Sequence, residues 1–246
     1  MNAAASSLRI ALVGNPNCGK TALFNRLTGA HQKVANYAGV TVERKEGRFV
    51  APSGRVLHLL DLPGAYSLDA ASPDEAITRD ICEGRHPVEP APDLIVCVAD
   101  ATNLRLHLRF VLEVKRLGRP MVLALNMIDA AHRRSIRIDT AALEAALGIP
   151  VVETIAVKHG GAAALVARID AMPMPAIPVG APEGAMLSAH ESTGMAPSDD
   201  AAFGEDSPEA LGLHEQVRAL LAATVTMPRA TAAADDAIDA VVLHPV

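Results

Sequence analysis

The sequence predicts an α/β fold in which a mostly parallel sheet is covered by helices on both faces. Two observations lead to this prediction. Short apolar runs alternate with helical patterns over the first two thirds of the chain, and a glycine-rich loop directly follows the first run. Strands buried on both faces are near-continuous apolar runs, and the crossover between two parallel strands is usually a helix.

Five apolar runs are the predicted strands: Leu8–Val13 and residues 56–60, 94–98, 121–125 and 150–156. Helices are predicted between them. The first spans residues 21–27 and ends near Gly29. A second begins at Ser72, where a serine cap, a proline in the first turn and Glu75 form a typical helix start. A third carries one apolar stripe, which consists of Leu104, Leu108, Val111 and Leu112.

The glycine-rich loop fits the phosphate-binding pattern G-x-x-x-x-G-K-[ST]. Its residues are Gly14, Asn15, Pro16, Asn17, Cys18, Gly19, Lys20 and Thr21. A strand that leads through such a loop into a helix directs backbone N–H groups and the positive end of the helix dipole at a phosphate chain. We expect Lys20 to reach the β- and γ-phosphates and the Thr21 hydroxyl to hold Mg²⁺.

Two further motifs stand at the ends of predicted strands, where open α/β sheets bind ligands. In Asp61-Leu62-Pro63-Gly64, Asp61 would hold Mg²⁺ through water, and the Gly64 N–H would meet the γ-phosphate. In Asn126-Met127-Ile128-Asp129, the Asp129 carboxylate would accept two N–H bonds from guanine, a donor pair that adenine lacks. Each motif arises by chance about once in a chain of this length. Their order along the chain, phosphate then metal then base, carries the prediction.

A threonine that closes over Mg²⁺ should lie between the first helix and Asp61. Thr41 is the best candidate. From the residues alone, an ordinary strand threonine is an equally good interpretation.

Residues 14–21, 39–47, 61–68, 100–104 and 126–129 together resemble the cytosolic G domain of the bacterial ferrous iron transporter family, FeoB. The resemblance is close over about residues 7–170 and loose beyond them. It implies a Ras-like P-loop GTPase fold with six strands, in which residues 44–50 are a single antiparallel edge strand. It also favours Thr41 as the Mg²⁺ ligand of the GTP state, and it implies that residues 31–47 and 61–75 are the switch segments.

The resemblance further implies a set of ligands and partners. GTP or GDP and Mg²⁺ would bind, with residues Asn126, Met127 and Asp129 and the loop of Ala156, Val157 and Lys158 at the base. The partners would be guanine nucleotide and the transporter's own downstream membrane domain, with self-association and small iron-transport accessory proteins left open. As part of the full-length protein, the chain would lie at the cytoplasmic face of the bacterial inner membrane, and alone it would be soluble.

Several residues depart from the pattern of assisted Ras-like GTPases. Ala65 stands where a glutamine would orient the attacking water, which predicts slow hydrolysis. Ala156 stands where a serine is usual, so any contact from that side chain is lost. Asn17 matches the position at which potassium-activated relatives hold K⁺ against the phosphates; the alternative is that it braces the loop. Cys18 is either a tolerated small residue or, less simply, a redox switch.

Composition and charge argue against several other kinds of binding site and protein. The chain has 246 residues, a net charge of −6 and no strong Lys/Arg cluster, which argues against a nucleic-acid surface. Three cysteines without a framework suit a reducing cytosol, and the scattered histidines lack metal-binding spacing, so we assign no iron site. No apolar run is long enough for a membrane span, and the N-terminus lacks a secretory signal.

Three regions are predicted along the chain: a GTP-binding domain at residues 1–170, a flexible connector rich in Pro, Gly, Ala and Ser at 171–210, and a helical subdomain at 211–246 that leads to a membrane domain. Two helices are expected in the last region. One follows the apolar spacing of Leu213, Val217, Leu220, Leu221 and Val225, and the other that of Ile238, Val241 and Val242.

The predicted function is a GTP-hydrolysing regulatory domain of a ferrous iron transporter. Two alternatives stay open at this point. One is a switch that binds GTP but hardly hydrolyses it, which Ala65 suggests. The other is a free-standing GTPase of ribosome assembly or tRNA modification, against which the acidic charge counts.

Overall fold

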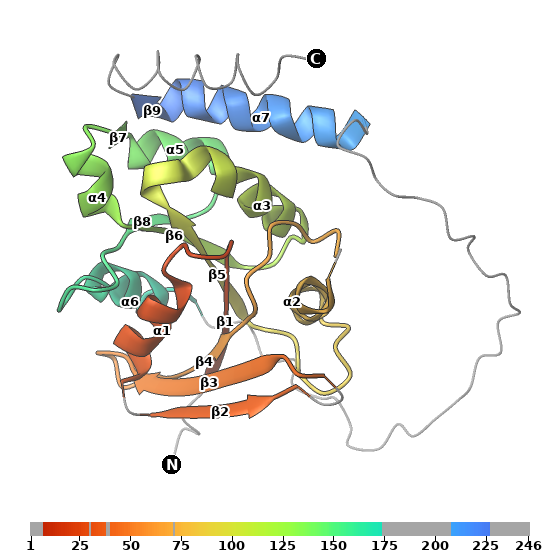
Figure 1. The fold of residues 1–246 in the computed structure, drawn as a ribbon. Coiled ribbons are helices and arrows are strands. Elements are labelled where there is room, and N and C mark those ends of the chain that lie inside the picture. Colours follow the sequence, from red (N-terminus) through yellow and green to blue (C-terminus); the bar gives the residue numbers. More distant parts are fainter. Residues whose placement is uncertain (1–6, 30, 38–39, 71, 174–207, 227–246) are drawn as a thin grey trace, which may run out of the picture.

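One twisted sheet forms the centre of the molecule, with helices on both of its faces (Figure 1). The computed structural model describes residues 7–29, 31–37, 40–70, 72–173 and 208–226. Within these residues, seven strands join in the order β2-β3-β4-β1-β5-β6-β8. They are β1 (Leu8–Val13), β2 (Gln32–Asn36), β3 (Glu43–Val50), β4 (Val56–Asp61), β5 (Leu94–Asp100), β6 (Met121–Asn126) and β8 (Val151–Glu153).

The predicted α/β fold is confirmed, and each of the five apolar runs contains a strand. β1 lies between β4 and β5 and is parallel to both, and β6 and β8 continue the sheet in the same direction. Side chains alternate between two apolar cores: Ala11 and Val13 face one, and Ile10 and Leu12 face the other. Burial on both faces explains why these strands are apolar throughout.

The predicted edge strand is wrong in its position but right in its direction. β3 is antiparallel to β4, yet it is not the edge, because β2 pairs with its outer side from Gln32 opposite Gly47 to Asn36 opposite Glu43. The sheet therefore has seven strands instead of six. The sequence gives no sign of β2, since most of its side chains are exposed and an exposed strand needs no apolar alternation.

Helices α1 and α6 pack on one face of the sheet, α2, α3, α4 and α5 pack on the other, and α7 lies outside α3 and α5. Their bounds are α1 (Lys20–Thr28), α2 (Pro73–Glu83), α3 (Leu104–Arg116), α4 (Ile128–Arg133), α5 (Thr140–Leu147), α6 (Ala163–Asp170) and α7 (Pro208–Thr224), with a 3₁₀ turn, η1 (Ala101–Asn103), before α3. The predicted start of α2 is confirmed, because the Ser72 hydroxyl accepts a hydrogen bond from the Glu75 N–H.

The C-terminal helix α7 packs directly on the preceding fold. Its residues Leu213 and Val217 are buried in the core formed with α3 and α5. A two-stranded ribbon of β7 (Arg137–Ile138) and β9 (Val225–Thr226) fastens its end, and the Asp139 N–H donates to the Thr224 carbonyl. The predicted connector lies almost wholly outside the described residues, and so does the second helix predicted around Ile238. The division into three regions stays a prediction.

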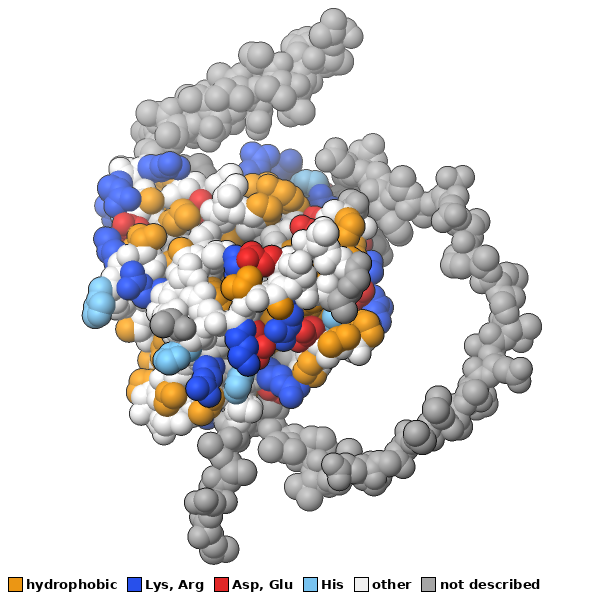
Figure 2. Space-filling model, turned by 60° about the horizontal axis from the view of Figure 1, so that its bottom comes forward, with side chains coloured by type: hydrophobic (Ala, Val, Ile, Leu, Met, Phe, Trp, Pro, Cys, Tyr) orange, Lys and Arg blue, Asp and Glu red, His pale blue; other side chains and the backbone are white. Residues whose placement is uncertain are grey.

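The surface in Figure 2 mixes Lys and Arg side chains with Asp and Glu side chains, and no large area of one sign covers that face. Among the helices of the described residues, none combines the length and the apolar character that crossing a bilayer demands.

Candidate functional site

The phosphate loop joins β1 to α1 and packs tightly against its neighbours. Gly19 precedes the helix with φ 86°, and a side chain there would collide with the Asn126 amide. A side chain at Gly14 would collide with the Val98 carbonyl. Both positions therefore require glycine, for their positive φ angles and for close approach. The loop therefore lies against β5 at Gly14 and against the end of β6 at Gly19.

The structure brings Lys20, Thr21 and Asp61 together, as the motifs predict. The Lys20 ammonium donates to Asp61 Oδ1 at 2.7 Å, and the Thr21 hydroxyl donates to Asp61 Oδ2 at 3.2 Å. The Lys20 and Asp61 side chains are only 10% and 4% exposed. A hydroxyl beside a carboxylate is a set of hard oxygen donors, which fits Mg²⁺. The phosphate contact expected of Lys20 would require this ammonium to exchange Asp61 for a phosphate oxygen.

The segment after Asp61 rests on the phosphate loop. A side-chain carbon at Gly64 would lie 3.1 Å from Pro16, so glycine permits this approach. The Ala65 N–H donates to the Gly14 carbonyl at 3.2 Å, and the Ala65 side chain is fully buried in the core. The side chain after Gly64 therefore points into the protein core.

Asn126 joins the phosphate loop to the loop of Ala156, Val157 and Lys158 (the base loop). It is 2% exposed, its Nδ2 donates to the Cys18 carbonyl at 3.0 Å, and its Oδ1 accepts from the Ala156 N–H at 3.0 Å and from the Thr154 hydroxyl at 3.3 Å. The sequence predicts Asn126 as a base contact. The structure adds a bracing role that fixes two ligand-binding loops relative to each other.

Nearly every backbone N–H and C=O group of the base loop is hydrogen-bonded. Besides the Ala156 bond to Asn126, the Lys158 N–H donates to the Ile155 carbonyl at 2.9 Å. Arg26 of α1 donates to the Ala156 and Val157 carbonyls at 3.1 and 2.8 Å. Nothing in the sequence singles out Arg26, because 130 residues separate it from Ala156.

Asp129 lies in the first turn of α4 and is paired with two cations. Its Oδ2 accepts from Arg133 at 2.9 Å and from Lys158 at 3.2 Å. The hydrogen bond from Arg133, assisted by that from Lys158, holds the pKa of this carboxyl below its usual value. It is therefore an anion at neutral pH, which the predicted contact with guanine N–H groups requires. The spacing of four residues from Asp129 could have revealed Arg133 in advance.

Thr41 is the predicted site residue that the structure does not join to the others. It is exposed, no hydrogen bond links it to Thr21 or Asp61 among the described residues, and it lines a cavity with Pro73 and Asp74 at the start of α2. Its role as a Mg²⁺ ligand stays a prediction. That role requires the segment around Thr41 to approach the phosphate loop.

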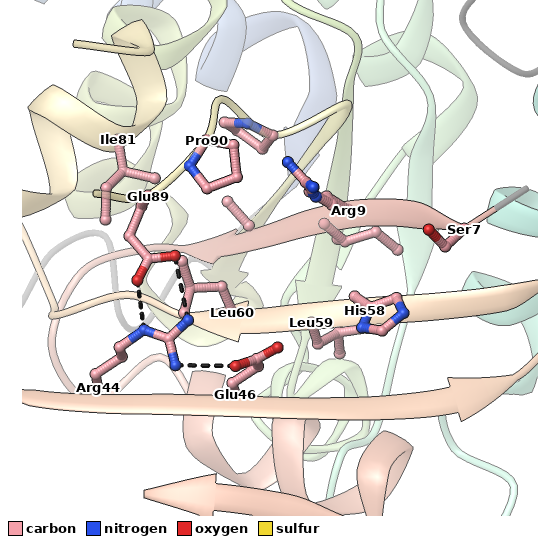
Figure 3. Close-up of a pocket in the computed structure, with 13 residues that line it drawn as sticks. Ser7, Arg9, Arg44, Glu46, His58, Leu59, Leu60, Ile81, Glu89 and Pro90 are labelled. Carbon is pink, nitrogen blue, oxygen red and sulfur yellow. Dashed lines mark hydrogen bonds and ion pairs between the residues drawn. The ribbon is translucent and has the colours of Figure 1, made fainter. Parts of the chain in front are cut away.

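Tyr37 and Arg44, which flank Thr41, make their contacts outside the phosphate site. Tyr37 is 3% exposed, packs edge-on against His86 at 5.8 Å between ring centres, and has no hydrogen-bond partner for its hydroxyl among the described residues. Burial raises the pKa of this hydroxyl. Arg44 extends from β3 to Glu89 and also to Glu46 (Figure 3). Its Nε lies 2.5 Å from Glu89 Oε1, and its Nη2 lies 3.2 Å from Glu89 Oε2. Arg44, Glu46 and Glu89 border a cavity of about 340 Å³.

Two residues of the phosphate loop had alternative interpretations. Asn17 is exposed in the left-handed conformation (φ 63°), and within the described part of the chain it makes no hydrogen bond that would brace the loop. Cys18 is fully buried, and burial raises the pKa of its thiol to about 11. The thiol is therefore protonated at neutral pH, which favours the small-residue interpretation over a redox switch.

Comparison with known proteins places the chain in a family. The model of the family described as ferrous iron transport protein B matches residues 8–169. This chain belongs to that family.

Relatives and solved structures agree with the assignment. The Fe(2+) transporter FeoB of Salmonella typhimurium is 46% identical over 163 residues, which are 66% of this chain and 21% of that protein. The chain thus spans about a fifth of the length of this curated FeoB relative. The cytosolic domain of L. pneumophila FeoB is 43% identical, with a TM-score of 0.60 over 65% of this chain and 66% of that one. The cytosolic domain of T. maritima FeoB in its GMPPNP form is 29% identical, with a TM-score of 0.72 over 89% of this chain and 99% of that one.

Proposed function

We propose that this chain is the GTP-binding and GTP-hydrolysing domain of a ferrous iron membrane transporter, and that its switch segments couple nucleotide state to Fe²⁺ uptake. The observation that carries the proposal is the convergence of Lys20, Thr21 and Asp61 at the start of α1. The FeoB relatives, among them forms with GDP and with GMPPNP, support it.

Each group of residues has a distinct task in this proposal. The loop N–H groups and Lys20 bind the phosphates, and the positive end of α1 adds to the attraction. Thr21 and Asp61, joined by Thr41 in the GTP state, would hold Mg²⁺, which neutralises phosphate charge. The Gly64 N–H meets the γ-phosphate. Asp129 and the base loop read guanine, with Met127 and Lys158 beside the base.

Exchange of the base reader tests the proposal. Asp129→Asn should weaken GDP binding by roughly a hundredfold and improve binding of xanthosine diphosphate, because an amide can donate to the xanthine 2-oxo group and a carboxylate cannot. Calorimetric titration of both nucleotides measures the change. An Arg168→Ala variant on α6 is the matched control, since that side chain contacts Glu144 and no site residue. Unchanged preference in Asp129→Asn would remove the proposal's base-reading step.

Hydrolysis should be slow, because the fully buried Ala65 presents no side chain to orient water. The same observation favours a second candidate function, a GTP-dependent binding switch that hardly turns over. Single-turnover hydrolysis at saturating Mg²⁺ distinguishes the two: product within minutes supports the GTPase, and intact GTP after hours supports the binding switch.

Potassium bound at Asn17 would supply positive charge to the transition state, as an arginine finger does in other GTPases. Asn17 is exposed at the tip of the loop and not engaged by it, so its side-chain oxygen can bind a cation beside the phosphates. GTP hydrolysis should run faster in KCl than in NaCl at equal ionic strength, and Asn17→Ala should abolish that difference while GDP affinity stays nearly the same. Equal rates in both salts for the unmutated protein would contradict the K⁺ site.

The wider context of the proposal is a membrane protein. The chain would act on a downstream membrane domain at the cytoplasmic face of the bacterial inner membrane. Co-expression of this chain with its membrane domain, followed by Fe²⁺ uptake in the presence and absence of the Lys20→Ala substitution, tests that coupling.

A further inference from the structure

Arg26 connects the helix of the phosphate loop to the loop that would contact the base. It stands in the last turn of α1, and its Nε donates to the Ala156 carbonyl at 3.1 Å while its Nη2 donates to the Val157 carbonyl at 2.8 Å. A guanidinium presents its donors in a fixed fork, so two consecutive carbonyls hold it in one orientation and are held by it. Arg26 thereby fixes the position of two peptide groups of the base loop.

The remaining bonds of this loop leave one suitable donor for a base. The Ala156 N–H is bonded to Asn126, and the Lys158 N–H is bonded to the Ile155 carbonyl. The Val157 N–H has no hydrogen-bond acceptor among the described residues, and the Val157 side chain is 74% exposed. Of these three N–H groups, that of Val157 is therefore the one available to guanine O6.

Arg26 acts on the same peptide group that carries this donor. The Ala156 carbonyl and the Val157 N–H belong to one amide, so a cation that bonds the carbonyl withdraws electron density from the N–H. Hydrogen bonds in such a chain strengthen one another. The guanidinium, the peptide 156–157 and the 6-oxo group of the base would form one polarised chain.

The side chains of the base loop itself do not bond these carbonyls, since the Lys158 ammonium is paired with Asp129. Ala156 carries only a methyl group, which is 2% exposed and packed with Ala162 and Leu165 in the core. Besides bonds within its own backbone, the loop is therefore held by Asn126 at one N–H and by Arg26 at two carbonyls.

We propose that Arg26 is a positioning residue for nucleotide specificity, which orients and polarises the peptide 156–157 so that the Val157 N–H recognises the 6-oxo group of guanine. This inference rests on the proposed function, since it requires a guanine nucleotide in the site.

The test combines a change in the protein with a change in the base. GDP and 6-thioguanosine diphosphate share the N–H groups that Asp129 reads, but sulfur is a weak hydrogen-bond acceptor. The unmutated chain should prefer GDP. Arg26→Ala should weaken GDP binding about tenfold and 6-thioguanosine diphosphate binding by less than about twofold, so that the preference collapses. Arg26→Lys, which offers one donor point in place of a fork, should fall between the two.

Each outcome decides a different question. Equal losses for the two nucleotides in Arg26→Ala would mean that the side chain only stabilises the fold, and the inference would be overturned. Arg168→Ala, the control on α6, should leave both affinities unchanged. If Arg26→Ala does not fold, Arg26→Lys and Arg26→Gln carry the same comparison. Failure of the unmutated chain to bind GDP would refute the proposed function itself, a result distinct from failure of the Arg26 role.

Discussion

The two halves of the candidate site differ in how they are built. In the base-and-phosphate half, Asn126 bonds the phosphate loop to the base loop, and Arg26 bonds α1 to the base loop. In the switch half, Tyr37 and Arg44 bond or pack against residues after α2, away from the phosphate loop, and Thr41 is exposed. The loops of the first half are therefore held in place relative to each other before any ligand binds. In the proposed function, the switch half has to rearrange before Thr41 can reach the Mg²⁺ site.

This difference has a physical rationale. Groups that are already held in the binding geometry lose little conformational entropy when the ligand binds, which favours affinity. A segment that reports the γ-phosphate must instead have two arrangements of similar free energy, and such segments come from the less stable parts of a fold. The buried Tyr37 hydroxyl lacks a partner among the described residues, which limits the stability of the arrangement seen here.

The largest effect is expected from a substitution in the phosphate half of the site. Lys20→Ala removes the cation that neutralises the nearly buried Asp61 and that would bind the phosphates. It should lower the free energy of unfolding by about 3 kcal/mol, as measured by urea denaturation. It should also weaken GTP binding by at least about tenfold, as measured by calorimetry.

A double variant separates these two losses. Adding Asp61→Asn to Lys20→Ala removes the uncompensated carboxylate, so stability should largely return while GTP affinity does not. Full GTP affinity in Lys20→Ala would contradict the assignment of the phosphate loop.

A smaller effect is expected in the switch half. Tyr37→Phe keeps the ring that packs against His86 and deletes a buried hydroxyl for which the described residues provide no partner. The free energy of unfolding should rise by about 1 kcal/mol, or a few degrees in Tm. Tyr66→Phe, at a residue whose side chain is 52% exposed, is the control and should change little. A loss of stability in Tyr37→Phe would show that the hydroxyl has a partner.

The smallest effect concerns the charge of Asp129, the proposed base contact. The hydrogen bond from Arg133 lowers the pKa of Asp129, so Arg133→Ala should move that pKa upward toward its ordinary value. A depressed pKa stabilises the folded chain above the ordinary carboxyl range, and this contribution is lost as the pH falls through the folded-state pKa. Carboxyl resonances followed by NMR through a pH titration measure the shift. An unchanged Asp129 pKa in Arg133→Ala would assign the effect to Lys158.

Much of the fold could be predicted because burial on both faces makes the central strands apolar. The phosphate loop, Asp61 and Asp129 could be predicted because each stands at the end of such a strand, where topology alone brings them together. β2 could not, since an exposed edge strand such as Gln32–Asn36 leaves no apolar pattern. The edge position predicted for β3 was wrong for the same reason.

The residues that support the site, such as Arg26, could not be predicted from the sequence either. Arg26 acts on carbonyls 130 and 131 residues away, and nothing in a local pattern records such a contact. The burial of Ala65 depends on the turn after Asp61, so the residue could be recognised as a missing glutamine but not as part of the core. Long-range hydrogen bonds and side-chain direction in loops need the three-dimensional structure.

Amide hydrogen exchange in two nucleotide states tests the contrast between the halves most directly. The chain is compared with Mg²⁺ and GDP and with Mg²⁺ and GMPPNP, which differ only by a γ-phosphate analogue. Exchange in residues 40–47 should slow by at least roughly tenfold with GMPPNP, while exchange in residues 154–161 should be the same in both states. Equal exchange of residues 40–47 in the two states, or a change of similar size in residues 154–161, would contradict the account.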